Sequence, residues 1–470
     1  MRKTKIICTL GPASESEEEI RKMCLAGMNV ARLNFSHGTR ADHLRRINVL
    51  KKVRKELSLP VALLLDTRGP EYRIGRFEGG RALLEDGGKF TFTSEDVLGS
   101  SERVSVDCAE MMSDLSVGDV ILVNNGLLSF KVEHLSETEA ECTVLSGGEI
   151  SDRKSMSFPG KVLSREYLSE RDKEDIRFGI EQGVDFIACS FVSERRDLEA
   201  IANYVATLSK EPPDLIAKIE NSHGIENIEE ICKSCEGVMI GRGDMGVEIP
   251  FTKLPAIQKQ LITKCRMLGK RVITATEMLE SMVSAPRPTR AEISDVANAV
   301  YDGTSAVMLS AETAVGKHPS LCVKTMSDIA EETEKRINYA KRFHSAEFKI
   351  ASIRDAISHA SCSVAINLDA KAIAVCTHSG ETARMVARFR PPMDIIGITV
   401  GERNMQKLAL SFGVIPVMCE EVTSTDVLFY MAKNLAKETL SLAEGDKIVI
   451  TGGRADGKIG GTDLVKAETV

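Results

Sequence analysis

The chain has 470 residues, a length that predicts two or three domains, and its 43% hydrophobic and 27% charged residues are typical of a globular protein. A net charge of −7 argues against a nucleic-acid-binding surface, and 4% aromatic residues without tryptophan argue against stacking of single strands. The first ten residues resemble a strand rather than an apolar leader, and no run of 18 apolar residues could cross a membrane. We therefore expect a cytoplasmic protein with no nucleic-acid and no membrane partner.

The twelve cysteines are scattered, and most lie inside apolar runs, as Cys8, Cys189 and Cys376 do. Buried free thiols have this distribution, which favours a reducing compartment. Cys232 and Cys235 form a single C-x-x-C without a second pair. On a helix these two thiols are simply neighbours, so we interpret them as structural and not as a metal or redox site.

Short apolar, β-branched runs alternate with helical segments along most of the chain. Helical intervals such as 15–26, 42–57 and 256–268 carry apolar residues at positions i, i+3 and i+4. Eight runs have the length of buried strands: Ile6–Leu10, Val30–Phe35, Val61–Leu65, Asp185–Phe191, Leu215–Ile219, Val238–Ile240, Arg271–Ala275 and Ser305–Leu309. This alternation predicts an α/β fold, a parallel (β/α)8 TIM barrel.

Polar residues gather at one end of these strands. In a TIM barrel the carboxyl ends of all strands meet on the catalytic face. The residues at those ends are Arg32, Asn34, Ser36, Asp66, Thr67, Lys218, Glu220, Asp244 and Thr276. Polar residues placed for solubility would fall at both ends, so this bias predicts an active site at the mouth of the barrel.

Two segments depart from the barrel pattern. Between residues 70 and 165, short alternating runs with turn signals such as Asn125-Gly126 predict a small β-barrel domain, inserted on the catalytic face as a lid. A helix over 320–340 would close the barrel, and a helix over 353–367 with four later strands predicts a separate α/β domain. We expect a barrel domain of residues 1–69 and 166–344, a lid domain of residues 70–165 and a C-terminal domain of residues 345–470.

The stretch from Asp214 to Pro250 carries the densest chemistry. Side chains two apart on a strand share a face, so Lys218 and Glu220 project together, and Asp244 follows the next strand. Mg²⁺ typically takes one or two protein carboxylates and completes its shell with water and substrate oxygens. The pattern suits a Mg²⁺ site beside a lysine that faces a transferring anion, and it equally suits a surface ion pair followed by a turn.

The sequence from Gly241 to Gly246 also satisfies the G-x-G-x-x-G dinucleotide fingerprint. A dinucleotide loop should open directly into a helix, whereas we expect no helix here because Val247–Pro250 follows and Pro250 lacks an N–H. The acid inside the loop, Asp244, would also repel a pyrophosphate. We therefore do not interpret this loop as an NAD site.

Six segments in order resemble the pyruvate kinase family. They start at Met28, Leu65, Ile216, Gly241, Ile273 and Pro286 and read MNVARLNFSHG, LDTRGPE, IAKIEN, GRGDMGVEIP, ITATEMLESM and PRPTRAE. The resemblance implies the bacterial form with a barrel, an inserted β lid and a C-terminal α/β domain, without an extra C-terminal extension and usually as a homotetramer. The family transfers the phosphoryl group of phosphoenolpyruvate to ADP in glycolysis, giving pyruvate and ATP.

The resemblance implies roles for the residues at the barrel mouth. Glu220 and Asp244 would bind Mg²⁺, or Mn²⁺ in its place, and Lys218 would stabilise the transferring group. The other substrate contacts would be the guanidinium of Arg32, backbone N–H groups at Gly243 and Asp244, and Thr276 near the protonated carbon. The final proton donor is not assigned.

Two further sets of residues match the family. Its K⁺ site would be formed by Asn34, Ser36, Asp66 and Thr67, and its nucleotide contacts by Asn34, Phe35, Ser36, His37, Arg73 and Lys154. Alone, Asn34 and Ser36 are also explained as strand-end caps and His37 as a loop histidine, but their register with Arg32 favours a functional interpretation. Family members with Glu at the position of Glu71 depend on K⁺ and members with Lys do not, so we expect K⁺-dependent activity.

In the C-terminal domain, Thr377–Thr382 lie between a strand and a helix, where hydroxyls and N–H groups could cradle a phosphate. The same pattern suits an ordinary capped turn. The family uses this loop for a phosphorylated allosteric effector, which implies contacts by Thr377, Ser379, Gly380, Thr382, Arg454 and Lys458. Fructose 1,6-bisphosphate, sugar monophosphates and AMP are all open as the effector.

The chain also departs from the family pattern. Asn124-Asn125-Gly126 stands where the lid usually has Asp-Asp-Gly, Met156–Gly160 replaces Val-Asn-Leu-Pro-Gly, Glu277 replaces Gln and Ala311 replaces Gly. These changes bear on the lid and on nucleotide affinity. Two other functions stay open: a Mg²⁺-dependent lyase or aldolase, against which the phosphate-gripping arginines argue, and a catalytically silent effector-binding protein.

Overall fold

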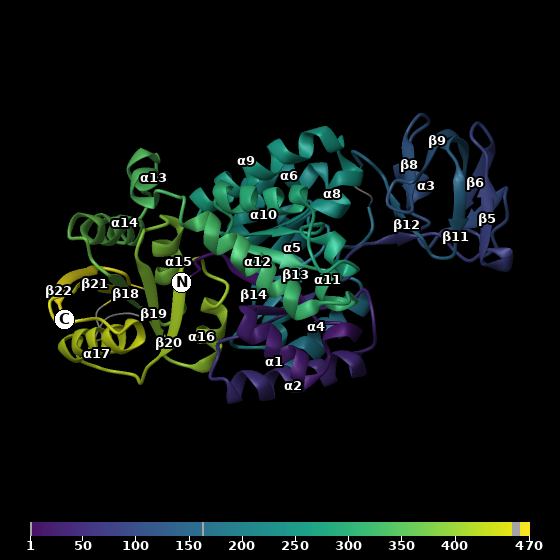
Figure 1. Ribbon diagram of the computed structural model, residues 1–470. Helices are drawn as coiled ribbons and strands as arrows, with labels where there is room; N and C mark the ends of the chain where they lie inside the picture. The colour runs from purple at the N-terminus through teal and green to yellow at the C-terminus, as the bar shows by residue number, and fades with distance from the viewer. Residues whose placement is uncertain (1, 162–163, 454–460) are drawn as a thin grey trace.

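The computed structural model describes residues 2–161, 164–453 and 461–470. The barrel lies in the middle of the molecule, the inserted β domain projects from one end and the C-terminal α/β domain packs against the other (Figure 1). Within the described residues, no helix is both long enough and apolar enough to cross a membrane.

Eight parallel strands form the predicted closed barrel. Around the barrel their order is β1, β17, β16, β15, β14, β13, β3, β2. The strands are β1 Lys5–Thr9, β2 Val30–Asn34, β3 Ala62–Asp66, β13 Phe186–Cys189, β14 Asp214–Ile219, β15 Gly237–Gly241, β16 Arg271–Ala275 and β17 Ala306–Leu309. All eight predicted strands are confirmed, with ends that shift by one or two residues at most.

Both faces of these strands are buried, which explains their nearly continuous apolar sequences. Ile7, Ile216 and Met239 belong to the cluster inside the barrel, and the residues next to them join the layer beneath the helices. Ala409 and Leu410 of the C-terminal domain also join the inner cluster. The C-terminal domain therefore closes the amino end of the barrel and leaves the carboxyl end open for a site.

Helices cover the outside of the barrel, and several start at a residue whose side chain caps the first turn, as Ser16 and Thr39 do. The helices are α1 Glu17–Ala26, α2 Arg40–Glu56, α4 Glu170–Glu181, α5 Arg195–Leu208, α6 Ser222–Glu226, α7 Ile228–Ile231, α8 Arg242–Glu248, α9 Leu254–Met267, α10 Arg290–Asp302, α11 Ala311–Ala314 and α12 Pro319–Glu334. Short 3-10 turns are η1 Pro12–Ser14, η3 Cys232–Ser234, η4 Phe251–Lys253 and η5 Glu280–Val283.

The single helix expected over 320–340 is wrong. Helix α12 ends at Glu334, and α13 Tyr339–Ser345 begins as a separate helix. Asn338 leaves the helical conformation, and its side chain accepts a hydrogen bond from the N–H of Lys341. This cap starts a new helix, so the chain turns here towards the C-terminal domain.

The inserted domain, which we call the lid, is built of β-strands as predicted. Its strands are β4 Tyr72–Arg73, β5 Arg81–Leu84, β6 Lys89–Thr93, β7 Arg103–Ser105, β8 Val120–Val123, β9 Leu128–Leu135, β10 Glu139–Ser146, β11 Gly148–Ser151 and β12 Ser155–Ser157, with η2 Glu78–Gly80 and α3 Met111–Asp114. Seven strands form one sheet whose edges, β4 and β7, meet through a bridge between Ile74 and Val106. The sheet thus curls back on itself around Phe90, Phe92 and Phe130.

The C-terminal domain is a five-stranded sheet with helices on its faces. Its order is β20, β19, β18, β21, β22. The strands are β18 Ala372–Cys376, β19 Asp394–Thr399, β20 Val414–Met418, β21 Lys447–Gly452 and β22 Leu464–Thr469, and the helices are α14 Ile353–Asn367, α15 Glu381–Arg388, α16 Glu402–Leu408 and α17 Thr425–Leu440. Only β22, which runs antiparallel to β21, was not among the predicted strands.

Candidate active site

A cavity of about 820 Å³ opens at the carboxyl ends of the barrel strands. It brings together most of the polar residues that the sequence placed at strand ends: Arg32, Asn34, Ser36, Lys218, Asp244 and Thr276. Further basic residues of its wall are Arg45, Arg46, Arg68 and Arg73. A concave surface with this excess of cations attracts anions despite the negative net charge of the whole chain.

Lys218 is held at the bottom of this cavity by three oxygen atoms. Its Nζ lies 2.7 Å from the Oγ of Ser190, 3.1 Å from Asp66 Oδ1 and 3.1 Å from Glu220 Oε1. Burial alone would lower the pKa of Lys218, but the carboxylates of Asp66 and Glu220 raise it above its ordinary value. The ammonium is therefore charged at neutral pH and is fixed in direction.

Arg32 and Asp66 form a buried ion pair next to Lys218. The Nε of Arg32 lies 2.6 Å from Asp66 Oδ2, and an Nη donates to Thr9 Oγ1 at 2.8 Å. Burial would raise the pKa of Asp66, yet the cations of Arg32 and Lys218 hold it below its ordinary value. One carboxylate thus orients two cations toward the same cavity.

Glu220 and Asp244 supply carboxylates from neighbouring elements. Glu220 is buried and accepts the N–H of Phe191 at 2.9 Å, while Asp244 is exposed in the first turn of α8. A Cβ on Gly241 would meet Glu220 Oε1 at 2.7 Å, so the glycine makes the room that this carboxylate occupies. Burial raises the pKa of Glu220.

These two carboxylates fit a divalent ion that takes most of its ligands from substrate and water. The described residues contain no group of three or more Asp, Glu, His or Cys side chains that could hold a metal without such help. Two carboxylates therefore suit Mg²⁺ or Mn²⁺, which can take further ligands from substrate and water, better than a metal ion whose ligands all come from the protein.

Helix α8 corrects one expectation about the Gly241–Gly246 segment. The segment opens directly into a helix that starts at Arg242, and Pro250 falls after its end. The absence of a helix thus fails as an argument against a dinucleotide loop, and the argument from Asp244 remains. The N–H of Gly243 donates to Thr276 Oγ1 at 2.8 Å, which links the helix start to the end of β16.

Two residues of the site were missed at the level of sequence. Ser190 is buried, bonds Lys218, and also donates to the carbonyl of Thr67 at 2.7 Å. Arg242 turns inward beneath Thr276, where its guanidinium donates to the carbonyls of Thr276 and Glu277. Both lie at strand ends, which was the available signal, but a serine and a second arginine there have no distinctive spacing.

The residues expected to bind K⁺ lie at the ends of two paired strands. Asn34 on β2 is the register partner of Asp66 on β3, and Thr67 follows directly. Asn34 Oδ1 accepts the N–H of Ser36 at 3.1 Å, the capping role considered above. The capping contact and a cation contact are compatible, because an amide oxygen has two lone pairs.

Only some of the residues expected to contact the nucleotide line this cavity. His37 and Arg73 line the cavity, but Phe35 and Lys154 do not. The Phe35 ring is buried and stacks on His43 with centroids 4.2 Å apart. A nucleotide contact by Phe35 would therefore have to use its backbone.

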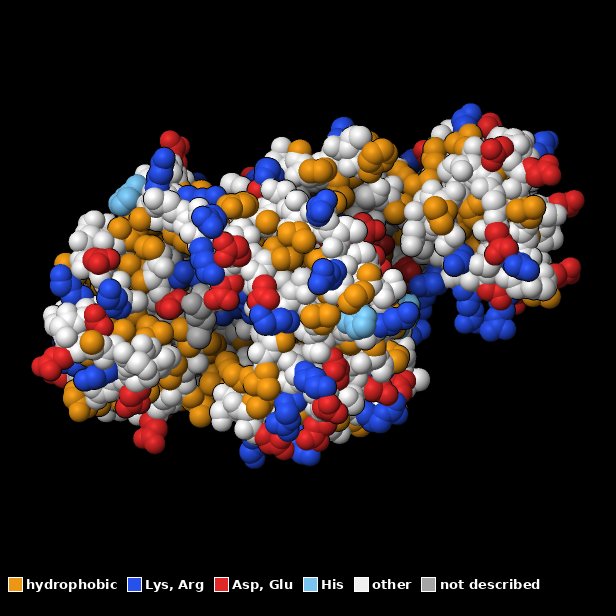
Figure 2. All heavy atoms as spheres, in the orientation of Figure 1, with side chains coloured by type: hydrophobic (Ala, Val, Ile, Leu, Met, Phe, Trp, Pro, Cys, Tyr) orange, Lys and Arg blue, Asp and Glu red, His pale blue; other side chains and the backbone are white. Residues whose placement is uncertain are grey.

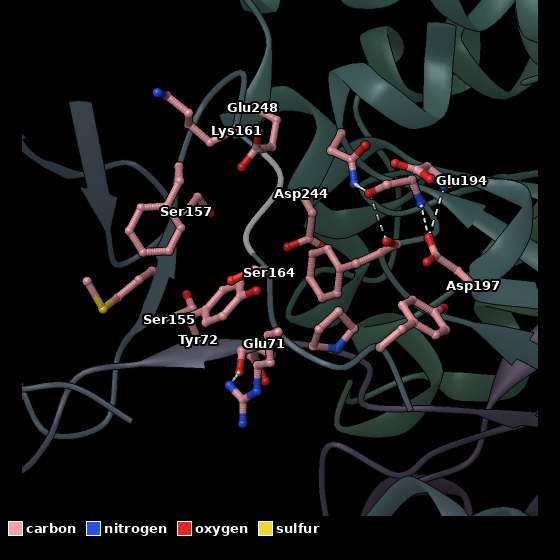
Figure 3. Close-up of a pocket in the computed structure, with 18 of the residues that line it drawn as sticks. Glu71, Tyr72, Ser155, Ser157, Lys161, Ser164, Glu194, Asp197, Asp244 and Glu248 are labelled. Carbon is pink, nitrogen blue, oxygen red and sulfur yellow. Dashed lines mark hydrogen bonds between the residues drawn. The ribbon is translucent and has the colours of Figure 1, made fainter. Parts of the chain in front are cut away.

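Glu71 lies where the barrel meets the lid. Its carboxylate is 2.6 Å from an Nη of Arg73 and 3.3 Å from the Nε of Arg68. It borders the large cavity and also a second cavity of about 490 Å³ between lid and barrel. Figure 3 shows this second cavity, with Tyr72 and Ser155 on the lid side and Asp244 and Glu248 facing it from α8.

The expected effector loop joins β18 to α15. Gly380 has a φ of 82°, and its N–H donates to Thr377 Oγ1 at 3.0 Å. The hydroxyl of Thr382 lies 2.7 Å from that of Thr462 and is buried. Ser379 is exposed, and Arg454 and Lys458 lie outside the described residues.

The fold and the cavity define a class of protein, an enzyme built on a (β/α)8 barrel whose basic mouth suits an anionic substrate. A family model described as pyruvate kinase, barrel domain, matches residues 1–323, and one described as pyruvate kinase, alpha/beta domain, matches residues 355–467. The chain belongs to the pyruvate kinase family.

Relatives agree along the whole length. The chain is 45% identical to a pyruvate kinase of Staphylococcus saprophyticus and 46% identical to one of Staphylococcus aureus, covering 100% of this chain and 81% of each relative. Its fold is similar to the crystal structure of a pyruvate kinase from Cryptosporidium parvum, with a TM-score of 0.94, 35% identity, and coverage of 100% and 96% of the two chains.

The activity follows from this membership. The protein is a phosphotransferase that moves the phosphoryl group of phosphoenolpyruvate to ADP and yields pyruvate and ATP, a step of glycolysis. Enzymes of this family generally need a divalent metal ion and K⁺.

Proposed function

We propose that Lys218 and Arg32 stabilise the phosphoryl group during its transfer. The observation that supports this proposal is that Asp66 forms ion pairs with both side chains and so orients them together. Phosphoryl transfer depends on positioning and on neutralising charge spread over the equatorial oxygens. Two cations that one carboxylate orients toward a single cavity meet both needs. All three Lys218 donors are engaged, so a substrate oxygen would replace the Ser190 hydroxyl, the one neutral partner among the described residues.

Glu220 and Asp244 are proposed to hold Mg²⁺, or Mn²⁺ in its place. When bound, the ion supplies Lewis-acid charge neutralisation at substrate oxygens. Backbone N–H groups of Gly243 and Asp244, at the start of α8, would bind the substrate carboxylate. The N–H of Gly243 donates to the hydroxyl of Thr276. A bound substrate carboxylate would accept this N–H instead, and the Thr276 hydroxyl would then be free next to the carbon to be protonated.

One assay tests this function against the alternatives. The enzyme with ADP, phosphoenolpyruvate, Mg²⁺ and K⁺ is expected to form ATP and pyruvate in equal amounts. Pyruvate without ATP would favour the lyase, and neither product would favour the silent effector-binding protein. Arg73→Met should weaken ADP-dependent product formation, whereas Arg81→Met, an exposed lid arginine, should not.

We expect turnover to fall by at least about 10-fold when K⁺ is replaced by tetramethylammonium at constant Mg²⁺, a barrier change of roughly 1.4 kcal/mol. The reason is that Asn34, Ser36, Asp66 and Thr67 offer a small cation oxygen ligands that a bulky cation cannot approach. Glu71→Lys should reduce this dependence by placing an ammonium nearby, and the exposed lid variant Glu78→Lys should leave it unchanged. Full turnover of the unmodified enzyme without K⁺ would refute the site.

A phosphorylated effector is proposed to bind the loop Thr377–Thr382, with Arg454 and Lys458 as additional contacts. We expect Thr382→Glu to weaken activation by at least about 10-fold, because a carboxylate repels a phosphate and disrupts the buried pair with Thr462. Enzyme activity is measured while fructose 1,6-bisphosphate, sugar monophosphates and AMP are titrated in turn. Thr382→Ser, which keeps the hydroxyl, is the control variant. Activation unchanged by Thr382→Glu would place the effector elsewhere.

The remaining expectations are also proposals. We propose a homotetramer, barrel limits of 1–69 and 166–344, lid limits of 70–165, and a C-terminal domain of 345–470 for effector binding and oligomerisation. A cytoplasmic location is supported by twelve free cysteines, eleven of them buried. Sedimentation of the full chain measures the oligomeric state.

A further inference from the structure

Six basic side chains meet at the seam between the barrel and the C-terminal domain. This seam cluster consists of Arg266, Lys270, Arg271, Arg384, Arg388 and Arg390. Arg266 lies at the end of α9, Lys270 in the turn that follows and Arg271 at the start of β16, and the others come from α15 and the residues just after it. Figure 1 shows α15 at the boundary of the two domains, and Figure 2 shows Lys and Arg side chains on the surface there, with Asp and Glu side chains beside them.

The seam cluster surrounds a small cavity of about 10 Å³. The rest of its wall is formed by Ser305, Ala387, Ser411 and Phe412. A space of this size admits one small particle, such as a water molecule or a single-atom ion. Phosphate groups and organic anions exceed it.

Few carboxylates balance these cations. Asp214 lies 2.8 Å from Arg271 but also 2.8 Å from Lys407, and it reaches Arg384 only at 4.0 Å. Asp355 lies 3.4 Å from Arg388. Among the described residues, no carboxylate lies within 4.0 Å of the cationic nitrogens of Arg266, Lys270 or Arg390. Positive charge at the seam therefore exceeds negative charge, and burial makes such an excess costly.

Hydrogen bonding is incomplete in the same place. Arg266, Arg384, Arg388 and Arg390 each keep a buried Nε–H without an acceptor in the described part of the chain. Arg390 is only 4% exposed and Arg388 only 7%, so bulk water does not satisfy them. Buried donors in native proteins nearly always have an acceptor.

The other contacts of Arg390 fix its guanidinium at this point. It donates to the Gly303 carbonyl at 2.8 Å and to Ser305 Oγ at 3.0 Å, and it lies 3.7 Å from the centre of the Phe412 ring. These partners are neutral. Burial, together with the smaller effect of the nearby Arg266, lowers the pKa of Arg390 to about 9. The guanidinium is thus held in place with no carboxylate of the described residues in direct contact, although Glu334 lies close enough to raise its pKa.

We propose that the cavity of the seam cluster binds one small monovalent anion, chloride, which accepts hydrogen bonds from the unpartnered Nε–H groups and supplies the missing negative charge. A water molecule, which is smaller than chloride and neutral, would accept two of these bonds but would leave the charge unbalanced. The bound anion joins α9 and β16 of the barrel to α15 of the C-terminal domain. It therefore stabilises the seam in proportion to its occupancy.

Crystals of the full chain grown with bromide in place of chloride test the site directly. We expect one anomalous peak between Arg384, Arg388 and Arg390. A peak absent from the cavity while other bromide peaks are present would overturn the proposal, since bromide is a close substitute for chloride in size and charge.

Thermal unfolding provides the second test. Raising chloride from 10 to 300 mM should increase Tm by at least about 2 °C more than gluconate at equal ionic strength, as mass action predicts for a ligand of the folded state. Arg384→Met, which removes one half-buried seam cation, should lose at least half of this difference.

Arg403→Met is the matched control. Arg403 also crosses the seam, donates to the Val184 carbonyl at 3.4 Å and keeps a buried Nε–H without an acceptor, but it does not line the cavity. Its loss should leave the chloride-dependent shift unchanged. Equal shifts in the unmodified chain and in Arg384→Met would contradict the proposal, as would an equal loss in both variants.

Discussion

The variant Lys218→Met is expected to lower kcat by about 10²–10³-fold, the scale for losing one group that stabilises developing charge in a preorganised site. Its ammonium is fixed by Ser190, Asp66 and Glu220 at the mouth of the barrel, so the charge needs no rearrangement at the moment of transfer. Methionine keeps the apolar stem and removes the charge. Initial rates of ATP and pyruvate formation at saturating substrates measure the effect.

The KM for phosphoenolpyruvate separates this role from simple binding. A cation that acts mainly on the transition state changes kcat far more than KM, whereas a cation that only binds the substrate changes KM. Lys22→Met is the control, because Lys22 forms an exposed ion pair with Glu18 on α1. The substitution at Lys218 leaves the buried Glu220 without its cation and Asp66 with Arg32 alone, so Tm is measured alongside. A folded Lys218→Met enzyme that retains more than about a tenth of wild-type kcat would contradict the proposed role.

The barrel could be predicted because burial on both faces leaves a clear trace in sequence. Val238–Ile240 shows the principle, since residues of the inner and outer layers alternate and both are apolar. The polar residues that follow each strand then lie together by geometry alone. This is why Arg32, Lys218 and Thr276 share one cavity although they are far apart in the chain.

Other features depend on contacts that spacing does not encode. The antiparallel β22 contains Lys466 and Glu468 at a sheet edge, so its pattern resembles that of a polar tail. Phe35 is next to two site residues but points into the core, because neighbours on a strand face opposite sides. Arg242 lies in a motif that suggests a surface loop, and only the packed structure shows its guanidinium beneath Thr276.

Arg242→Met is expected to reduce kcat/KM by about 10²-fold, the scale for small misplacements of reacting groups, and to lower the free energy of unfolding by about 3 kcal/mol. The buried guanidinium donates to the carbonyls of Thr276 and Glu277 and lies 2.6 Å from Asp295. Thr276 and Glu277 have φ values of 68° and 55°, a conformation that costs non-glycine residues free energy. Without the guanidinium this turn is free to relax.

Relaxation of the turn should move the Thr276 hydroxyl away from the N–H of Gly243, and so away from its proposed place beside the substrate. Arg242→Lys keeps a charge but lacks the planar fork that reaches two carbonyls and Asp295 together, and its activity should lie between those of the unmodified enzyme and Arg242→Met. Arg195→Met is the control, because Arg195 is paired with Glu199 on the exposed face of α5. Urea unfolding and steady-state kinetics are measured on the same preparations. If Arg242→Met unfolds at lower urea but keeps kcat/KM within about threefold of the unmodified enzyme, the guanidinium contributes to stability alone and does not position Thr276.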